Sequence, residues 1–254
     1  MLSEQYLVEI ILKKDEISDS SVYPFNLDAI SNLDRLKLHP KVTFFVGENG
    51  SGKSTLLEAI AIANGFNPEG GTKNFGFSTR ESHSILEKYI RCSRGIKKPK
   101  DGYFLRAESF FNVASEIEAL DNEFSFGPPI IESYGGKSLH EQSHGESFFA
   151  LLTNRFSRES LFILDEPEAA LSPSRQMSMI CRMHELASLN CQFLIATHSP
   201  ILMAYPDADI LVLGENGIVK TEYKETEHYT VMKSFISNPE GMLKQLLEPT
   251  NDAV

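Results

Sequence analysis

The chain has 254 residues, of which 41% are hydrophobic and 23% charged, a balance that indicates a folded globular protein and excludes wholesale disorder. This length accommodates one large α/β domain. No apolar run approaches a membrane span, so we expect a cytoplasmic protein without direct membrane insertion. The formal net charge of −11 opposes attraction to nucleic acid, so any DNA contact should be weak for the protein alone and should need a local basic patch.

The first predicted elements are a strand over residues 6–12, rich in β-branched and apolar side chains, and a polar turn over 13–21. A second strand is predicted over 42–46. Between them lies Tyr23-Pro24-Phe25, whose aromatic rings have two interpretations. One ring stacks on the adenine of a bound nucleotide, or both pack beneath the sheet, and the sequence leaves these alternatives open.

A glycine-rich turn, GENGSGKST, follows the second strand and precedes a helix-forming run over 56–63. The spacing from Gly47 to Gly52-Lys53-Ser54 fits the P-loop pattern, in which main-chain N–H groups converge on phosphate oxygens at the start of a helix. Lys53 is expected to reach the β- and γ-phosphates of ATP and to act in catalysis, and the Ser54 hydroxyl to ligate Mg²⁺. The residues predicted to bind the nucleotide here are Asn49, Gly50, Ser51, Gly52, Lys53, Ser54 and Thr55.

The middle of the chain predicts a loop (64–76), a helix (84–91), a strand (103–107), a helix (109–120) and a long connection (121–137). It carries the densest basic run of the chain: Lys88, Arg91, Arg94, Lys97, Lys98 and Lys100. Aromatic residues that favour nucleic-acid binding are few here, so a solvated surface is the favoured interpretation and a phosphate contact the alternative.

Two later strands end in polar side chains. The run 161–164 is apolar and leads into Asp165-Glu166-Pro167, as expected of a buried parallel strand that brings carboxylates to the edge of a sheet. Two adjacent acids need a cation, so we predict that Asp165 holds Mg²⁺ and that Glu166 is the base that orients the attacking water. The next such strand, 193–197, leads into His198, which we expect to contact the γ-phosphate and that water.

Between the P-loop and the acids lies Ser143-His144-Gly145-Glu146-Ser147, followed by a helical run over 148–155. A hydroxyl and a glycine amide at a helix start make a second anion site. We assign Glu146 of the same motif to this site. The order and spacing of these motifs, with Ala170-Leu171-Ser172 after the acids, resemble an ATP-binding-cassette (ABC) ATPase over about residues 6–217.

This resemblance implies the fold: an α/β P-loop NTPase with a mainly parallel sheet, an N-terminal antiparallel β portion and a small helical signature lobe. The whole chain, 1–254, would be one domain with that lobe inserted at about 77–157. Ser143 and Gly145 would belong to the signature motif, which binds the γ-phosphate of ATP held by the other protomer, residues 170–172 to the D-loop, and His198 would be the switch histidine. An ATP-dependent homodimer follows from this arrangement.

The motifs depart from the transporter subtype of the family. That subtype has a Gly where His144 stands, and a metal-sensing Gln after the strand that precedes the signature lobe. Glu108 is our candidate for the place of that Gln and for a metal ligand. The chain more closely resembles the non-transporter SMC, RecF and phage-defence groups, although it has no heptads for a coiled coil.

We therefore expect a Mg²⁺-dependent ATPase that controls an unidentified soluble effector protein in DNA repair or anti-phage defence. The alternatives are the nucleotide-binding subunit of an ABC transporter and an ATP-binding switch with negligible turnover.

Two predictions concern the remaining helices. After Ser172-Pro173, a good helix start, the apolar positions at helical spacing predict a core stripe of Met177, Ile180, Cys181, His184 and Ala187. The segment 231–247, interrupted by Asn238-Pro239, predicts two short helices that pack on the domain, with a partner dock as the alternative.

Overall fold

The computed structural model describes residues 5–73, 84–107, 109–122 and 127–247. Its main element is a six-stranded sheet in the order β5-β6-β7-β3-β8-β9. Five strands run parallel, and β9 pairs antiparallel with β8 at one edge. The strands are β3 (Val42–Val46), β5 (Asp101–Arg106), β6 (Ser160–Asp165), β7 (Gln192–Ala196), β8 (Asp209–Gly214) and β9 (Gly217–Thr221).

A second sheet is antiparallel and has the order β2-β1-β4, formed by β2 (Arg35–Lys37), β1 (Leu7–Leu12) and β4 (Ile90–Arg94). It confirms the predicted antiparallel portion. The helix predicted over 84–91 is wrong in extent: α3 covers only Leu86–Tyr89. Ile90 already pairs with Leu12, because the β-branched side chain is buried in the sheet.

Hydrophobic side chains cover both faces of the six-stranded sheet, which explains why β3, β6 and β7 are buried along their whole length. Phe44 belongs to one core with α6 (Pro173–Ser188), and its neighbour Phe45 belongs to the other core with α2 (Lys53–Ala63) and the antiparallel sheet. Alternate residues of a strand face opposite ways, so each strand serves both cores.

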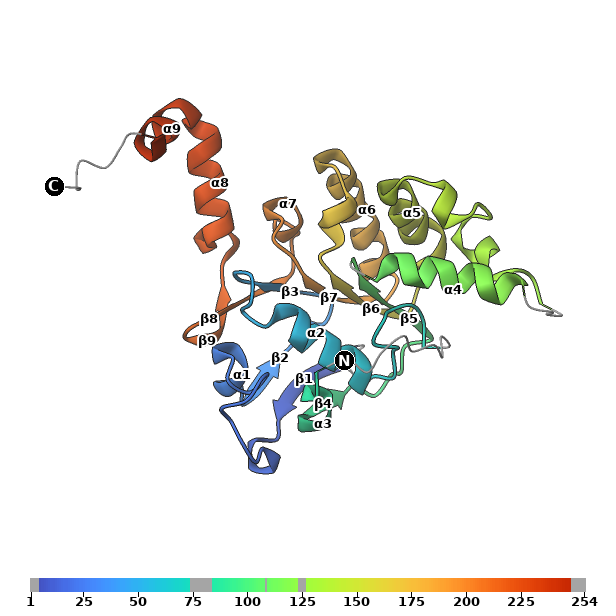
Figure 1. The fold of residues 1–254 in the computed structure, drawn as a ribbon, viewed down its shortest axis with the longest axis horizontal. Coiled ribbons are helices and arrows are strands. Elements are labelled where there is room, and N and C mark those ends of the chain that lie inside the picture. The colour runs from blue at the N-terminus through green and yellow to red at the C-terminus, as the bar shows by residue number, and fades with distance from the viewer. Residues whose placement is uncertain (1–4, 74–83, 108, 123–126, 248–254) are drawn as a thin grey trace.

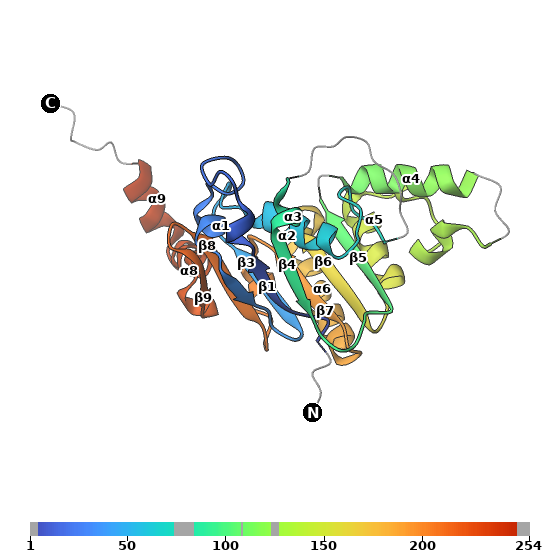
Figure 2. The same cartoon turned by 90° about the horizontal axis from the view of Figure 1, so that it is seen from below.

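Two helices lie beside the β5 end of the large sheet in both views (Figures 1 and 2). These are α4 (Phe110–Asn122) and α5 (His144–Ala150), the latter continued by a π-helical turn over Leu151–Arg155. The predicted lobe range 77–157 also contains β4 and β5, which belong to the sheets. Its boundaries as an inserted lobe stay a prediction.

The side of α6 that faces the core differs from the predicted stripe. Met179, Met183, Leu186 and Ala187 are buried, whereas Met177 is 55% exposed and Cys181 is also exposed. Ala187 is the one buried member of the predicted stripe. Methionines stand at both 177 and 179, and the sequence pattern does not show which of them faces the core, so packing alone selects Met179.

The C-terminal segment forms α8 (Glu227–Ser237) and α9 (Pro239–Leu247), which confirms two helices. Packing on the domain is wrong: neither helix has a buried residue, and Figure 1 shows the pair projecting away from the sheets. Two further short helices are α1 (Asp28–Ser31) and α7 (Pro200–Met203). Within the described ranges, no helix is long and apolar enough to cross a membrane.

Candidate functional site

The predicted site residues follow three adjacent strands, because the sheet order places β6, β7 and β3 side by side. All three run parallel, and Ala196 of β7 is level with both Asp165 of β6 and Phe45 of β3. The P-loop after β3, the acids at the end of β6 and His198 after β7 are therefore delivered to the same edge of the sheet.

The P-loop has the backbone that its glycines permit. Gly47 has a φ of 151°, and a Cβ atom there would lie 2.4 Å from the carbonyl oxygen of Leu213, so the site excludes any side chain. Gly52 has a φ of 97° and immediately precedes α2. The start of α2 consequently presents its free N–H groups at the turn, an arrangement suited to an anion.

Lys53 lies within the turn. Its Nζ donates to the carbonyl oxygens of Gly47 at 2.8 Å and Glu48 at 2.9 Å. Burial lowers the pKa of Lys53, and the nearby Glu166 and Asp165 carboxylates oppose this shift. A partly desolvated cation is attracted to a phosphate more strongly than a fully hydrated one, because the local dielectric constant is lower.

The Ser54 hydroxyl donates to Asp165 Oδ1 at 3.0 Å, which joins the P-loop helix to the end of β6. A hydroxyl and a carboxylate are oxygen ligands of the type that Mg²⁺ prefers. Ser51 Oγ is buried and has no hydrogen-bond partner among the residues described, so the cradle contains a polar atom ready for a ligand. On both observations the residues present fit Mg²⁺ and a nucleotide phosphate.

Glu166 and His198 face each other across the strand ends, with Glu166 Oε1 3.7 Å from His198 Nε2. The Glu166 main chain is left-handed, at φ 50° and ψ 52°. This conformation costs a non-glycine residue on the order of 1 kcal/mol, and such strain is concentrated at functional sites.

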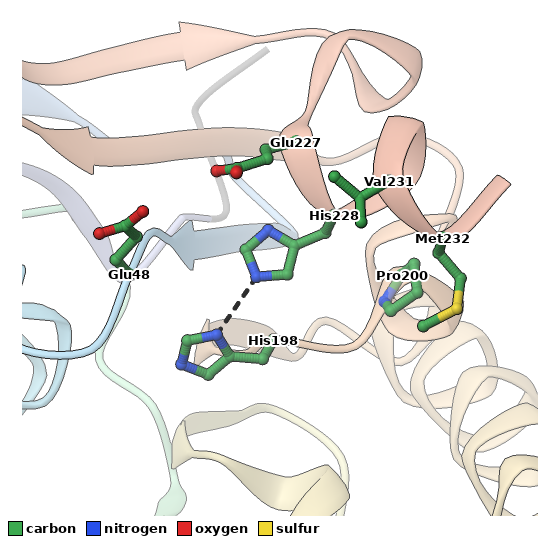
Figure 3. Close-up of a pocket in the computed structure, with 7 residues that line it drawn as sticks. All are labelled: Glu48, His198, Pro200, Glu227, His228, Val231 and Met232. Atoms are coloured by element: carbon green, nitrogen blue, oxygen red, sulfur yellow. Dashed lines mark hydrogen bonds between the residues drawn. The ribbon is translucent and has the colours of Figure 1, made fainter. Parts of the chain in front are cut away.

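Two residues that the sequence prediction missed hold His198 in place. The Glu168 carboxylate accepts from the His198 main-chain N–H at 2.6 Å, and His228 Nε2 lies 3.2 Å from His198 Nδ1 (Figure 3). Burial lowers the pKa of His198, as does the charge of Lys53, and burial raises the pKa of Glu168. Glu168 follows the acids in sequence, but no signal marks His228, which lies on a helix 30 residues later.

Cavities lie on both sides of the P-loop. One, of about 500 Å³, is lined by residues 47–51, the start of α1 and residues 212–215. The other, of about 510 Å³, is lined by Tyr23, Ser54, Thr55 and Arg106 among others.

The two aromatic residues of the 23–25 segment are in different surroundings. Phe25 is buried, with its ring edge-on to Tyr89, whereas Tyr23 is 59% exposed and its hydroxyl lies 2.7 Å from that of Thr55. Packing thus accounts for Phe25, and a base contact remains open for Tyr23.

The Ser143 motif forms the start of α5. Ser143 is the N-cap, and its main-chain N–H and hydroxyl donate to Glu146 at 3.0 and 2.6 Å. Gly145 lies against the 3-10 turn Pro167–Ala170, where an added Cβ would be 2.7 Å from the Ala170 carbonyl oxygen. α5 lies beside the β5 end of the large sheet (Figures 1 and 2), whereas the P-loop follows β3, and the sheet order places β6 and β7 between β5 and β3. Glu108, the predicted Gln replacement, lies outside the described residues.

Comparisons with known proteins show which families and proteins the chain is similar to. The family described as "AAA domain" matches residues 25–143, and the family described as "AAA domain, putative AbiEii toxin, Type IV TA system" matches residues 132–204. A relative named "Putative ABC transporter ATP-binding protein", from Caldanaerobacter subterraneus, is 30% identical over 203 residues, which are 73% of this chain and 81% of the relative.

A second relative is the "Chromosome partition protein Smc" of Methanocaldococcus jannaschii, 30% identical over 53% of this chain and 13% of that protein. Two further relatives are named as ATP-binding proteins of transport systems, and the chain spans 52% and 51% of their lengths. Among solved structures, CbiO1 from Clostridium perfringens, part of the ABC transporter complex CbiONQ, has a TM-score of 0.47 at 18% identity, covering 96% of this chain and 100% of that one.

Proposed function

The chain belongs to the ABC family of ATP-binding proteins, and from that premise we propose that it hydrolyses Mg²⁺-ATP as a homodimer that encloses two ATP molecules. The observation that carries the proposal is the junction of Ser54 with Asp165 beside Lys53 and Glu166. A helix start, a buried cation, two Mg²⁺-type oxygen ligands and the carboxylate of Glu166 beside His198 are together the components of phosphoryl transfer to water.

Each residue then has a stated role. The main-chain N–H groups of residues 49–55 and the Lys53 ammonium bind the phosphates, while Ser54 and Asp165 hold Mg²⁺. When bound, Mg²⁺ offsets the negative charge of the transferring phosphoryl group. Glu166 accepts the proton of the attacking water, and His198 Nε2 lies beside that carboxylate, where it orients the water and contacts the γ-phosphate.

The second half of each site comes from the other subunit in this proposal. Ser143 begins α5 beside the β5 end of the sheet, whereas the P-loop of the same chain follows β3, and the sheet order places β6 and β7 between those two strands. A two-fold dimer that stacks on the carboxyl edges of the strands would bring the Ser143 and Gly145 of one subunit to the nucleotide of the other.

The experiment mixes two inactive variants, Lys53→Ala and Ser143→Arg. In a mixed dimer one site carries both lesions and the other joins an intact P-loop to an intact signature, so part of the ATPase activity should return. Differential tagging confirms that mixed dimers form. If tagged mixed dimers bind ATP at neither site, Ser143 does not serve the neighbouring nucleotide.

The partner that the ATPase controls is the finer part of the proposal. We infer a soluble effector in DNA repair or anti-phage defence, supported by the toxin-system description of the family that matches residues 132–204 and by the Smc relative. A transporter subunit is the second candidate, supported by the name of the 30% identical relative. Proteins co-purified from the native cell with ATP present discriminate them: a membrane protein favours the transporter, and a soluble nuclease or toxin favours the effector.

A binding switch with negligible turnover is a further alternative. Phosphate release at saturating ATP decides it, and the Glu166 carboxylate beside His198 argues for turnover.

A further inference from the structure

His228 of α8 contacts the proposed switch histidine, although α8 has no buried residue. Its Nε2 is 3.2 Å from His198 Nδ1. The remaining ring nitrogen of His198, Nε2, lies 3.7 Å from Glu166 Oε1. The two nitrogens of His198 therefore have different neighbours, and the hydrogen bond at one constrains the proton at the other.

The carboxylate of Glu166 favours one of the two tautomers of His198. If His198 Nδ1 donated to His228, the bare Nε2 would face the Glu166 carboxylate, and two acceptors would oppose each other. If His228 Nε2 donates to Nδ1, His198 carries its proton on Nε2, which faces a carboxylate. The second arrangement is the favourable one. Nε2 is buried and makes no hydrogen bond within the described part of the chain, so its N–H is available to a ligand.

We propose that His228 is a positioning residue for ATP hydrolysis: it donates to His198 Nδ1 and so holds the imidazole with its Nε2–H directed at Glu166 and the transferring phosphate. This inference rests on the proposed function. It gives the first turn of α8 a role at the nucleotide that no motif of the sequence marks.

The first turn of α8 is held where this role requires it. The Thr226 side chain, 2% exposed, caps α8 and donates to the Tyr223 carbonyl oxygen at 2.8 Å. The Tyr223 hydroxyl donates to the carbonyl oxygen of Pro200, two residues after His198, at 3.0 Å. His228 and His198 are thus tied to one short segment, while the rest of α8 extends into solvent. Beside them a cavity of about 300 Å³ is lined by Glu48, His198, Pro200, Glu227, His228, Val231 and Met232.

The kinetic test compares three variants in the full chain. His228→Leu removes the donor, and we expect kcat to fall about tenfold, as for other residues that orient a functional histidine, with little change in KM for ATP. His228→Gln reaches the Nε2 position through the same number of bonds and carries an N–H donor, so it should recover most of the loss. Lys233→Ala, on an exposed part of α8, is the control and should turn over like the wild type.

A spectroscopic test needs no turnover. The ¹⁵N signals of the His198 ring, assigned with His198→Ala, should show a protonated Nε2 and an Nδ1 that accepts a hydrogen bond. In His228→Leu the Nδ1 signal should move towards that of a nitrogen without a donor, and His228→Gln should restore it.

Wild-type kcat in His228→Leu, or an unchanged Nδ1 signal, would overturn the inference. So would a Gln variant as slow as the Leu variant. Absence of hydrolysis by the wild type would instead refute the proposed function, and the ring signals would still report whether His228 donates to His198.

Discussion

At the scale of single residues, Lys53 shows how the P-loop holds its ammonium group in the described structure. The ammonium donates to two carbonyl oxygens of its own turn, and burial lowers its pKa. Carbonyl oxygens are weaker partners for an ammonium than phosphate oxygens, because a phosphate group carries a full negative charge and a carbonyl oxygen only a partial one. Lys53 is thereby placed for exchange onto a phosphate without leaving the turn.

Lys53→Ala should weaken ATP binding and lower hydrolysis on the order of a hundred- to a thousandfold, because it removes a preorganised charge from the transferring phosphate. Phosphate-release kinetics and a nucleotide-binding titration measure the two effects. Lys220→Ala is the matched control, because Lys220 is paired with Asp209 on the outer strands β8 and β9. Near-normal turnover of Lys53→Ala would refute the P-loop assignment.

At the scale of elements, the start of α5 is fitted against the turn that follows the acids. Gly145 allows the helix to approach the Ala170 carbonyl oxygen, and Glu146 closes a capping box on Ser143. The helix α5 and the turn next to Glu166 are therefore in direct contact within one chain. A displacement of either must be accommodated by the other.

Gly145→Ala should lower the thermal stability, since its Cβ would lie 2.7 Å from a main-chain oxygen and α5 must shift to relieve the contact. The expected cost is about 1–3 kcal/mol, typical of overpacking, and calorimetry or circular dichroism measures it. Gly214→Ala serves as the stability control, because its added Cβ has open space. Equal melting temperatures for Gly145→Ala and the wild type would contradict the close fit of α5.

At the scale of the whole molecule, the sheet order places the proposed catalytic groups on one edge, with α8 and α9 beside β8–β9 at one end and α4 and α5 beside β5 at the other (Figures 1 and 2). In the proposed dimer, a two-fold axis brings the α5 end of each subunit to the nucleotide of the other subunit. Closure of this dimer then depends on ATP bound at the strand edge, and hydrolysis of the ATP lets the dimer open.

Glu166→Gln should retain ATP, hydrolyse it slowly and accumulate the closed dimer, because the amide keeps the shape of the side chain and loses the base. Size-exclusion chromatography with Mg²⁺ and ATP measures the dimer, and the same run without nucleotide is its control. A variant that stays monomeric at saturating ATP would count against the sandwich arrangement.

The local motifs were readable because each is a short stretch with its own chemistry. The P-loop, the carboxylates after β6 and the histidine after β7 are each contiguous, and all three are found at the predicted ends of buried strands. Their convergence followed from general rules, since parallel strands deliver their carboxyl ends to one edge. The predicted family and fold class were confirmed.

What the sequence by itself determined is therefore the nucleotide-type cradle, its acidic partner strand and the α/β class, all of which depend on local spacing. Only the tertiary structure decided which helix faces are buried and which distant residues meet. Met179 rather than Met177 enters the core, and α8 leaves the domain after one anchored turn. The contact of His228 with His198 joins residues 30 positions apart through Tyr223 and Pro200. Hydrophobic periodicity predicts the buried face of a helix only to within a residue or two. A hydrogen bond between distant segments leaves no pattern in the sequence of either segment. Packing alone therefore selects the buried face and the long-range contact.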